Sequence, residues 1–341
     1  MSAPELGFYA LAGHVESPRD MLAELRLAEE LGLGAAFLSE RLNVKEAASL
    51  SGAAVAVTEH LRVVTAATNQ SWRHPAVTAA WATTVHRLSN GRFVLGLGRG
   101  LAAQFEAFGL PPVTTARMED FIGLMRRLWR GETIVDHDGP AGRYPMLRLD
   151  PTFDEAIPIG LVGLGPATLD LAGRAADLVV LHPFFSDDAV RRCVARIRGA
   201  AERAGRDPGS VQVWACPPVV PDPVDDEARL RRVVARLATY LQMYGDLMVK
   251  VNDWDPAVLK RFREDPVVSH LAGFADAVAT PRQVEQLATL LPEEWTEPAA
   301  VGDAARCADA VQRQFGLGVD GVLMHGSTPA QLAPVVAAYL A

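Results

Sequence analysis

The sequence has very little lysine and cysteine. Three lysines occur among 341 residues, so arginine supplies almost all of the positive charge. The cysteines are scattered, without the spacing of a metal site: Cys193, Cys216 and Cys307. Neither a disulfide framework nor a zinc site is indicated, and we expect a reducing compartment, the cytoplasm.

Long apolar runs and a basic surface are also missing. No stretch approaches the roughly 18 apolar residues of a membrane span, and the first residues lack a basic region followed by an apolar one. The net charge of −8 argues against nucleic acid as a partner. With 22% charged and 49% hydrophobic residues, the composition is that of a globular protein with neither membrane nor nucleic acid as partner.

Motifs for metal or serine catalysis are absent as well. The chain contains no His-x-His, no His-Glu-x-x-His and no Gly-x-Ser-x-Gly. We therefore expect a bound organic cofactor to supply the chemistry, with no metal site, while the protein provides orientation and electrostatics.

The residues that are present alternate between strand and helix patterns. Eight apolar segments of strand length are expected, at 6–11, 35–39, 61–66, 93–97, 157–162, 178–181, 211–215 and 321–324. A helical pattern follows each of them, as at 47–58, 116–130 and 328–340. The alternation predicts an α/β fold, a (β/α)8 TIM barrel forming a single domain over residues 1–341.

Two segments do not fit the simple repeat. Residues 131–156, rich in Gly, Pro and Asp, are expected to be an excursion from the barrel. Residues 217–300 form a larger insertion between strands seven and eight, starting with a linker and a helix at 227–243. We expect this helical insertion to cover the mouth of the barrel or to support a homodimer.

Three ordered motifs carry a family resemblance. They are RHPAVTAAWATTVHRLSNGRFVLGLGRG at 73–100, the helix 20–33 followed by FLSER at 37–41, and IPIGLVGLGPATLDLAGRAADLVVL at 157–181. Together they resemble the luciferase-like monooxygenase superfamily, and within it the oxidoreductases that use the deazaflavin coenzyme F420. The resemblance implies a luciferase-like barrel with the cofactor at the carboxyl ends of the strands.

The glycine-rich end of the fourth strand is the first candidate site. No helix is expected to begin directly after Gly100, and no acidic residue follows at the spacing of a dinucleotide-binding motif. A tight turn remains one interpretation. The resemblance instead implies that Gly98, Arg99 and Gly100 are neighbours of the cofactor or the substrate.

The end of the fifth strand is the candidate phosphate site. A helix is expected to begin at Pro166, and free amide groups at a helix N-terminus favour an anion. A plain turn before a helix is the alternative. The resemblance implies that the cofactor phosphate binds to Gly163, Leu164, Gly165, Pro166, Ala167 and Thr168.

The second strand ends in Glu40 and Arg41. A surface salt bridge is one interpretation of this pair. The resemblance implies that Glu40 hydrogen-bonds the cofactor ring. Relatives usually have histidine after the acid, and Arg41 cannot practically lose a proton. We therefore expect Arg41 to offer charge to the anionic deazaflavin or to a substrate anion.

After the third strand, the resemblance implies a non-proline cis peptide bond between Ala66 and Ala67, beneath the cofactor ring. The neighbouring cofactor-binding residues are then Thr68 and Asn69.

Three histidines follow expected strand ends: His14, His182 and His325. Imidazole is suited to proton transfer near neutral pH, although each histidine could instead only bond locally. We select His182 as the catalytic candidate, because strand six lies beside the phosphate-bearing strand five.

Three functions remain open. The first is an F420-dependent oxidoreductase that passes hydride between the deazaflavin C5 and an unidentified small-molecule substrate. The second is an FMN-dependent monooxygenase, and the third is a non-catalytic flavin-binding barrel. Substrate selection is expected to depend on residues 11–17, 41–46, 69–72 and 217–300.

Overall fold

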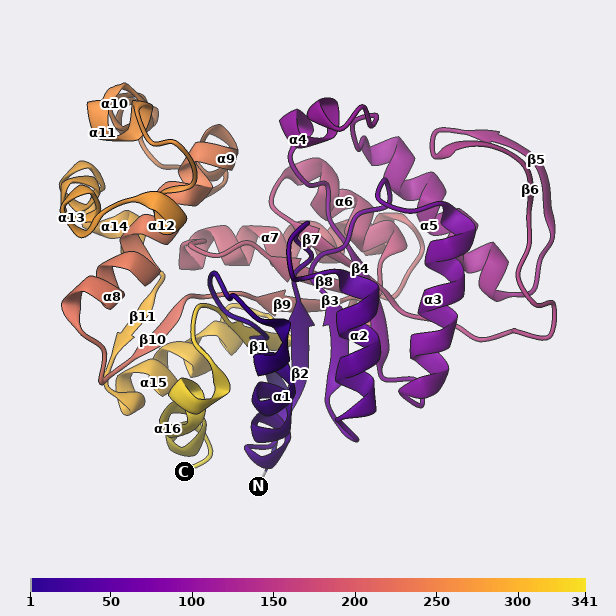
Figure 1. The fold of residues 1–341 in the computed structure, drawn as a ribbon, viewed down its shortest axis with the longest axis horizontal. Coiled ribbons are helices and arrows are strands. Elements are labelled where there is room, and N and C mark those ends of the chain that lie inside the picture. The colour runs from indigo at the N-terminus through magenta and orange to yellow at the C-terminus, as the bar shows by residue number, and fades with distance from the viewer. Residues whose placement is uncertain (1) are drawn as a thin grey trace.

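A computed structural model describes residues 2–341 and has a closed barrel of eight parallel strands at its centre (Figure 1). Around the barrel the strands run in the order β1-β12-β9-β8-β7-β4-β3-β2. Their bounds are β1 (Ala3–Tyr9), β2 (Leu33–Leu38), β3 (Arg62–Thr65), β4 (Phe93–Leu97), β7 (Ile159–Gly163), β8 (Leu178–Leu181), β9 (Gln212–Ala215) and β12 (Gly321–Met324). The prediction of a TIM barrel is confirmed, and each expected strand is present within three residues of its expected start.

Helices cover the outside of the barrel. They are η1 (Pro18–Asp20), α1 (Met21–Glu30), α2 (Ala47–Ala56), α3 (Pro75–Leu88), α5 (Thr115–Trp129), α6 (Pro166–Ala175), α7 (Asp187–Arg203), η2 (Pro208–Ser210), α15 (Ala304–Phe315) and α16 (Pro329–Tyr339). Local sequence explains their ends. The α3 helix begins with a proline in its first turn, and the chain leaves it through Asn90 and Gly91, both with positive φ.

The barrel interior is a packed apolar core. Phe37 and Trp214 meet inside it with ring centroids 5.1 Å apart, and Cys216 is 3% exposed beside them. The interpretation of Cys216 as a residue that fills the barrel is therefore confirmed. Because the interior holds no channel, the sites open to a ligand lie at the strand ends, as in other barrels of this type.

Two local predictions were incomplete. The excursion at 131–156 contains an antiparallel hairpin of β5 (Ile134–Gly139) and β6 (Gly142–Leu147). The expectation that no helix follows Gly100 directly was wrong, because α4 (Ala102–Ala107) starts two residues later. Phe105 holds this short helix in place by packing on Trp72, with centroids 4.9 Å apart. Such a tertiary contact leaves no local pattern in the sequence.

The insertion after β9 forms a helical subdomain. It contains α8 (Asp226–Leu230), η3 (Arg231–Ala235), α9 (Arg236–Asn252), α10 (Pro256–Glu264), α11 (Pro266–Ser269), α12 (Ala275–Val278), α13 (Pro281–Leu290) and α14 (Glu293–Thr296). The expected helix at 227–243 is thus the start of a longer continuous element. Two strands that were not expected, β10 (Val219–Pro221) and β11 (Ala300–Gly302), pair in parallel at the base of the subdomain.

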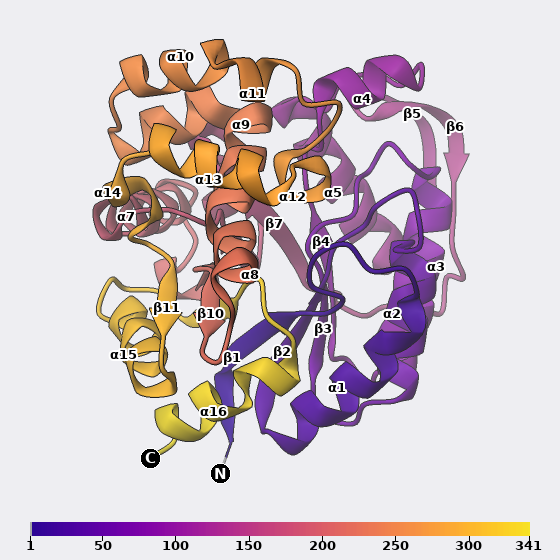
Figure 2. The same cartoon turned by 60° about the vertical axis from the view of Figure 1, so that its left-hand side comes forward.

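The helical subdomain has its own core and lies beside the carboxyl ends of the barrel strands (Figure 2). Trp254 and Trp295 stack within this core at 4.4 Å. The α9 helix brings Tyr240 and Tyr244 against His182, which follows β8. Within residues 2–341, no helix is both long enough and apolar enough to cross a membrane.

Candidate active site

The loops after β3 and β4 are joined by hydrogen bonds. The Thr68 amide donates to the Gly96 carbonyl over 3.0 Å, and the Gly98 amide donates to the Thr68 carbonyl over 2.9 Å. The Asn69 side-chain amide donates to the Gly98 carbonyl over 2.7 Å. The peptide bond between Ala66 and Ala67 is cis, as the resemblance implied. Two of the expected cofactor segments therefore form one surface.

Two glycines in this surface are needed for its geometry. A Cβ on Gly98 would lie 2.9 Å from the Ala67 Cβ, so a side chain would push the two loops apart. Gly100 has a φ of +65°, and a Cβ there would lie 2.7 Å from the Phe105 ring. The glycines keep the backbone open at the strand end.

Arg99 connects this surface to the expected phosphate site. Its Nε donates to the Thr168 hydroxyl over 2.8 Å, and its Nη1 donates to the Val113 carbonyl over 2.9 Å. The other Nη donates to Thr115 Oγ1. All three nitrogens of the guanidinium are therefore bonded to protein oxygens, so Arg99 holds the site together and its charge lies beside α6.

The expected phosphate site lies at the N-terminus of α6. The Thr168 and Leu169 amides donate to the Gly165 carbonyl, whereas the amides of Gly165 and Ala167 have no acceptor within residues 2–341. Ala167 is exposed and Gly165 is partly exposed. A Cβ on Gly165 would lie 3.1 Å from the side chain of Leu247, which brings α9 over this end of the helix.

The Glu40 carboxylate is occupied by protein partners. It forms an ion pair with Arg73, and it accepts hydrogen bonds from the Thr68 hydroxyl at 2.6 Å and from the Ala47 amide at 3.1 Å. The Glu40 side chain is 2% exposed. Arg73 also pairs with Glu46, whose pKa is lowered to about 2, chiefly by hydrogen bonds from Ser49 and Arg73 against the opposing effect of burial. Glu40 is thus linked to the loop surface through Thr68.

Arg41 lies in a different set of contacts. Its Nη1 is 3.5 Å from His14 Nδ1, and His14 Nε2 is 3.2 Å from an Asp276 carboxylate oxygen. Asp276 also pairs with Arg236 of α9 at 2.6 Å. The adjacent residues Glu40 and Arg41 therefore face different neighbours of β2. Glu40 contacts the loop after β3, Arg41 contacts the loop after β1, and the two form no salt bridge with each other.

His182 is buried under the aromatic residues of α9. Its exposed fraction is 8%, and its ring centroid is 4.5 Å from that of Tyr240. Its Nδ1 is 3.0 Å from the Pro183 carbonyl oxygen, which requires the proton on Nδ1 and leaves Nε2 as an acceptor. Burial lowers the pKa of His182 to about 4, so the ring is neutral at pH 7.

His325 and Tyr240 form a second pair, and both residues are half-buried. The Tyr240 hydroxyl is 3.2 Å from His325 Nε2, and burial raises the pKa of Tyr240 to about 12. Burial also holds the pKa of His325 well below its ordinary range, and its Nδ1 has no partner within residues 2–341. On the other side of His325, the Tyr9 hydroxyl donates to the Ala66 carbonyl over 3.0 Å, beside the cis peptide bond.

The sequence did not identify several residues of this region. Tyr9 ends β1 and Arg73 begins the motif at 73–100, so their positions offered a signal that was not used. Arg236, Tyr240 and Asp276 come from the helical subdomain, and no motif in the insertion marks them. Only the fold brings them to the barrel.

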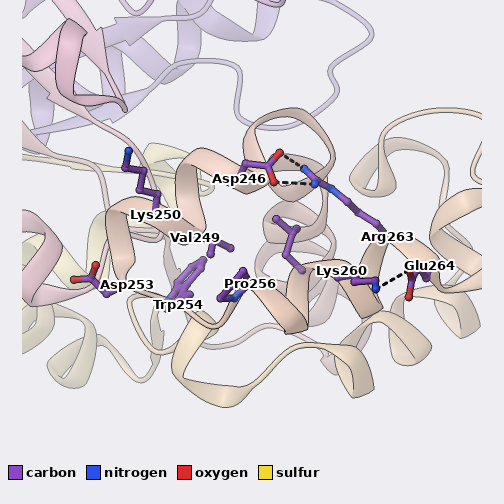
Figure 3. A pocket seen from close by; sticks show the side chains of 10 residues that line it. Asp246, Val249, Lys250, Asp253, Trp254, Pro256, Lys260, Arg263 and Glu264 are labelled. Atoms are coloured by element: carbon purple, nitrogen blue, oxygen red, sulfur yellow. Dashed lines mark hydrogen bonds and ion pairs between the residues drawn. The ribbon is translucent and has the colours of Figure 1, made fainter.

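Two cavities lie outside the glycine loops that follow β4 and β7. One, of about 750 Å³, is a groove between α9 and α10 lined by Trp254 and the ion pairs Asp246–Arg263 and Lys260–Glu264 (Figure 3). Another, of about 320 Å³, lies between the loop at 70–75 and Tyr144 of the hairpin. Neither contains the glycine loops, so we place the candidate site on the loop surface.

The chain matches the family model of the luciferase-like monooxygenases over residues 4–321. It belongs to this family, and the expectation of an enzyme of the oxidoreductase class is confirmed at that level. A 5,10-methylenetetrahydromethanopterin reductase of Methanolobus tindarius is 28% identical over 242 residues, which cover 68% of this chain and 70% of the relative. A phthiodiolone/phenolphthiodiolone dimycocerosates ketoreductase of Mycobacterium tuberculosis is 32% identical over 54% of this chain and 50% of its own length.

Solved structures share the whole fold. The coenzyme F420-dependent tetrahydromethanopterin reductase of Methanopyrus kandleri superposes with a TM-score of 0.80 at 18% identity, covering 98% of both chains. The oxygenating constituent of 3,6-diketocamphane monooxygenase of Pseudomonas putida, in complex with FMN, superposes with a TM-score of 0.67 at 17% identity, covering 98% of this chain and 97% of that one. At these identities the superpositions establish the fold alone.

Proposed function

We propose that the protein is an F420-dependent oxidoreductase that transfers hydride between the deazaflavin and an organic substrate. The proposal rests on one observation: hydrogen bonds connect the three expected cofactor segments to one another. Asn69 bonds to Gly98, and Arg99 bonds to Thr168, so the ends of β3, β4 and β7 present one connected surface. The similarity to a methanopterin reductase of Methanolobus tindarius supports the deazaflavin as the cofactor.

The residues on this surface fit a ring with a phosphorylated tail. The unpaired amides of Gly165 and Ala167 at the start of α6 would hold a phosphate, with Arg99 adding positive charge nearby. The Ala66–Ala67 peptide and Gly98, which lack bulky side chains, would face the ring. Once bound, the deazaflavin supplies hydride transfer at its C5.

In this proposal Glu40 is a positioning residue. Its carboxylate fixes the Thr68 hydroxyl and the Arg73 guanidinium, and thereby the loop that carries the cis peptide. His182, neutral at pH 7, would accept a proton at Nε2, and the Tyr240 hydroxyl beside it would remain protonated. The proposal keeps His182 as the catalytic residue, in the role of a proton acceptor. Arg41 supplies a fixed positive charge.

An FMN-dependent monooxygenase is the second candidate, because a structure with this fold binds FMN. The same amides would hold the FMN phosphate. A flavin-binding barrel without catalysis is the third candidate, since arginine replaces the histidine of the dehydrogenase branch. We further propose a cytoplasmic homodimer acting on a small molecule, which analytical ultracentrifugation and fractionation would test.

Titration of the apoprotein with F420 and FMN side by side tests the assignment. We expect F420 to bind at least tenfold more tightly, a difference of about 1.4 kcal/mol. Equal affinities or tighter FMN binding would overturn the deazaflavin proposal in favour of the monooxygenase. Turnover of reduced cofactor with any substrate would exclude the non-catalytic alternative.

A further inference from the structure

Arg41 is a partly exposed cation without a carboxylate partner. It forms no salt bridge within residues 2–341, and its guanidinium is 3.5 Å from His14 Nδ1. His14 is itself 42% exposed on its side chain, so solvent reaches this part of the barrel mouth. The guanidinium therefore has donors available for a bound group.

The carboxylate that His14 contacts is already engaged by other donors. Asp276, 4% exposed on its side chain, pairs with Arg236 at 2.6 Å and accepts from the Thr239 hydroxyl at 2.8 Å. His14 lies 3.2 Å from the same carboxylate. One negative charge is thus shared among several donors, and it does not neutralise both arginines.

Lys45 is a third cation in this region, beside Arg41 and Arg236. Lys45 is 2% exposed, and its ammonium donates to the backbone carbonyls of Leu11 and Gly13. Its pKa is lowered to about 8, mainly by burial and then by the charges of Arg41 and Arg236. Three cations therefore act on one another at this point of the mouth, opposed by two carboxylates, Asp276 and Glu24, of which Glu24 accepts from the Leu11 amide. The remaining positive charge favours the approach of an anion.

The position of these groups separates them from the expected cofactor phosphate. The loops after β3, β4 and β7 lie together on one arc of the barrel, whereas β1 and β2 are neighbours on another. His14 and Arg41 follow β1 and β2, and Arg236 comes from the helical subdomain. Three of the four segments expected to select the substrate therefore meet here.

We propose that Arg41 and Arg236 form a subsite for the oxyanion of the substrate, a carboxylate or a phosphate. The assignment of this anion to a substrate rests on the proposed function, whereas the anion site itself does not. A guanidinium suits both groups because its planar N–H donors match two oxygens at once. Asp276 holds Arg236 in place, and the Arg41 guanidinium keeps N–H donors free for the anion.

Isothermal titration calorimetry with inorganic phosphate and with acetate tests the subsite. The protein is first loaded with F420, so that the probe does not fill the cofactor phosphate site at α6. We expect Arg41→Gln to weaken binding of the probe at least tenfold, and Arg41→Lys to weaken it less. Arg143→Gln is the matched control, because Arg143 is an arginine on the hairpin with an 82% exposed side chain. Arg236→Lys keeps the charge beside buried Asp276 and should retain part of the binding.

The outcomes distinguish the proposed anion subsite from the proposed F420 cofactor. Phosphate binding that depends on Arg41 indicates a phosphorylated substrate, and acetate binding indicates a carboxylic acid. If neither probe binds in an Arg41-dependent way, the subsite is refuted. It is also refuted if Arg41→Gln weakens F420 tenfold but leaves probe binding unchanged, since Arg41 would then face the cofactor. Failure of F420 to bind, with Arg41-dependent phosphate binding to the apoprotein, would refute the cofactor assignment alone.

Discussion

Arg99 Nε donates to Thr168 Oγ1 over 2.8 Å, joining the loop after β4 to the first turn of α6. The two residues are 69 positions apart in the chain, and the sequence marked each of them separately. Because the hydroxyl accepts from Arg99, its own hydrogen remains free to donate to a ligand. One hydrogen bond thus links the glycine loop to the expected phosphate site.

Arg99→Lys should weaken both the fold and the cofactor site. Lysine keeps the charge but cannot reach the oxygens of Thr168, Val113 and Thr115 together. We expect the free energy of unfolding to fall by about 1–3 kcal/mol and F420 affinity to fall with it, measured by denaturant titration and calorimetry. Arg174→Lys, on the same α6 helix, is the control and should leave affinity unchanged. Unchanged stability of Arg99→Lys would contradict the bridging role.

Gly165→Asp should lower cofactor affinity tenfold or more, because it places a carboxylate beside the free amides of α6. Gly165→Ala adds the same Cβ, 3.1 Å from Leu247, without the charge and should have a smaller effect. Dissociation constants from fluorescence titration of the folded variants measure both. Equal losses would assign the effect to the contact with Leu247, and no loss in either would place the phosphate elsewhere.

Glu40→Gln removes the charge that pairs with Arg73 while keeping the side-chain size. A charge-assisted hydrogen bond contributes about 1.5–3 kcal/mol, so we expect a stability loss of that order and a ten- to hundredfold drop in binding or turnover. Glu46→Gln is the control, because Glu46 also pairs with Arg73 but is 45% exposed, and its effect should be smaller. Lost affinity at full stability would mean that Glu40 contacts the cofactor directly.

The pKa of His182 predicts a pH dependence of stability. It is about 4 in the folded protein because of burial, whereas an unfolded histidine titrates near its ordinary 6.5. Between these values the unfolded state binds more protons, so stability should rise with pH from about 4 to 6.5. The slope should be at most about 1.4 kcal/mol per pH unit for this residue. His182→Asn should reduce the slope in urea titrations across this range, and NMR should show a neutral ring at pH 5. A ring that titrates near 6.5 would refute the buried neutral state.

Proton transfer should depend on the residues around His182. We expect His182→Ala and Tyr240→Phe each to reduce turnover by about a hundredfold or more, because a proton-transfer group contributes roughly 10²–10⁴-fold. His14→Ala should mainly affect substrate affinity, because His14 contacts Arg41 and Asp276. Single alanine changes at His14, His182 and His325, assayed with reduced cofactor, separate these roles. Turnover that survives all three would assign the proton to water or to the substrate.

The barrel could be predicted from the sequence because its signals are local. Strands such as β4 and β8 are short apolar runs with the bounds that the sequence predicted. Helix starts at Pro75 and Pro166 follow from the fixed φ of proline. The order of the motifs also identified the family. In contrast, the hairpin of β5 and β6 has few buried residues, so no clear alternation marked it.

The sequence by itself determined the strands, most of the helices and the segments that follow the strands. Only the tertiary structure decided what the individual side chains do. Glu40 and Arg41 are adjacent in the chain, yet successive side chains of an extended backbone point in opposite directions. Glu40 therefore packs toward Arg73 and Thr68, while Arg41 faces His14 and the helical subdomain. The partners on that side, Asp276 and Arg236, are more than 190 residues away in the sequence, and closure of the barrel with its insertion brings them together.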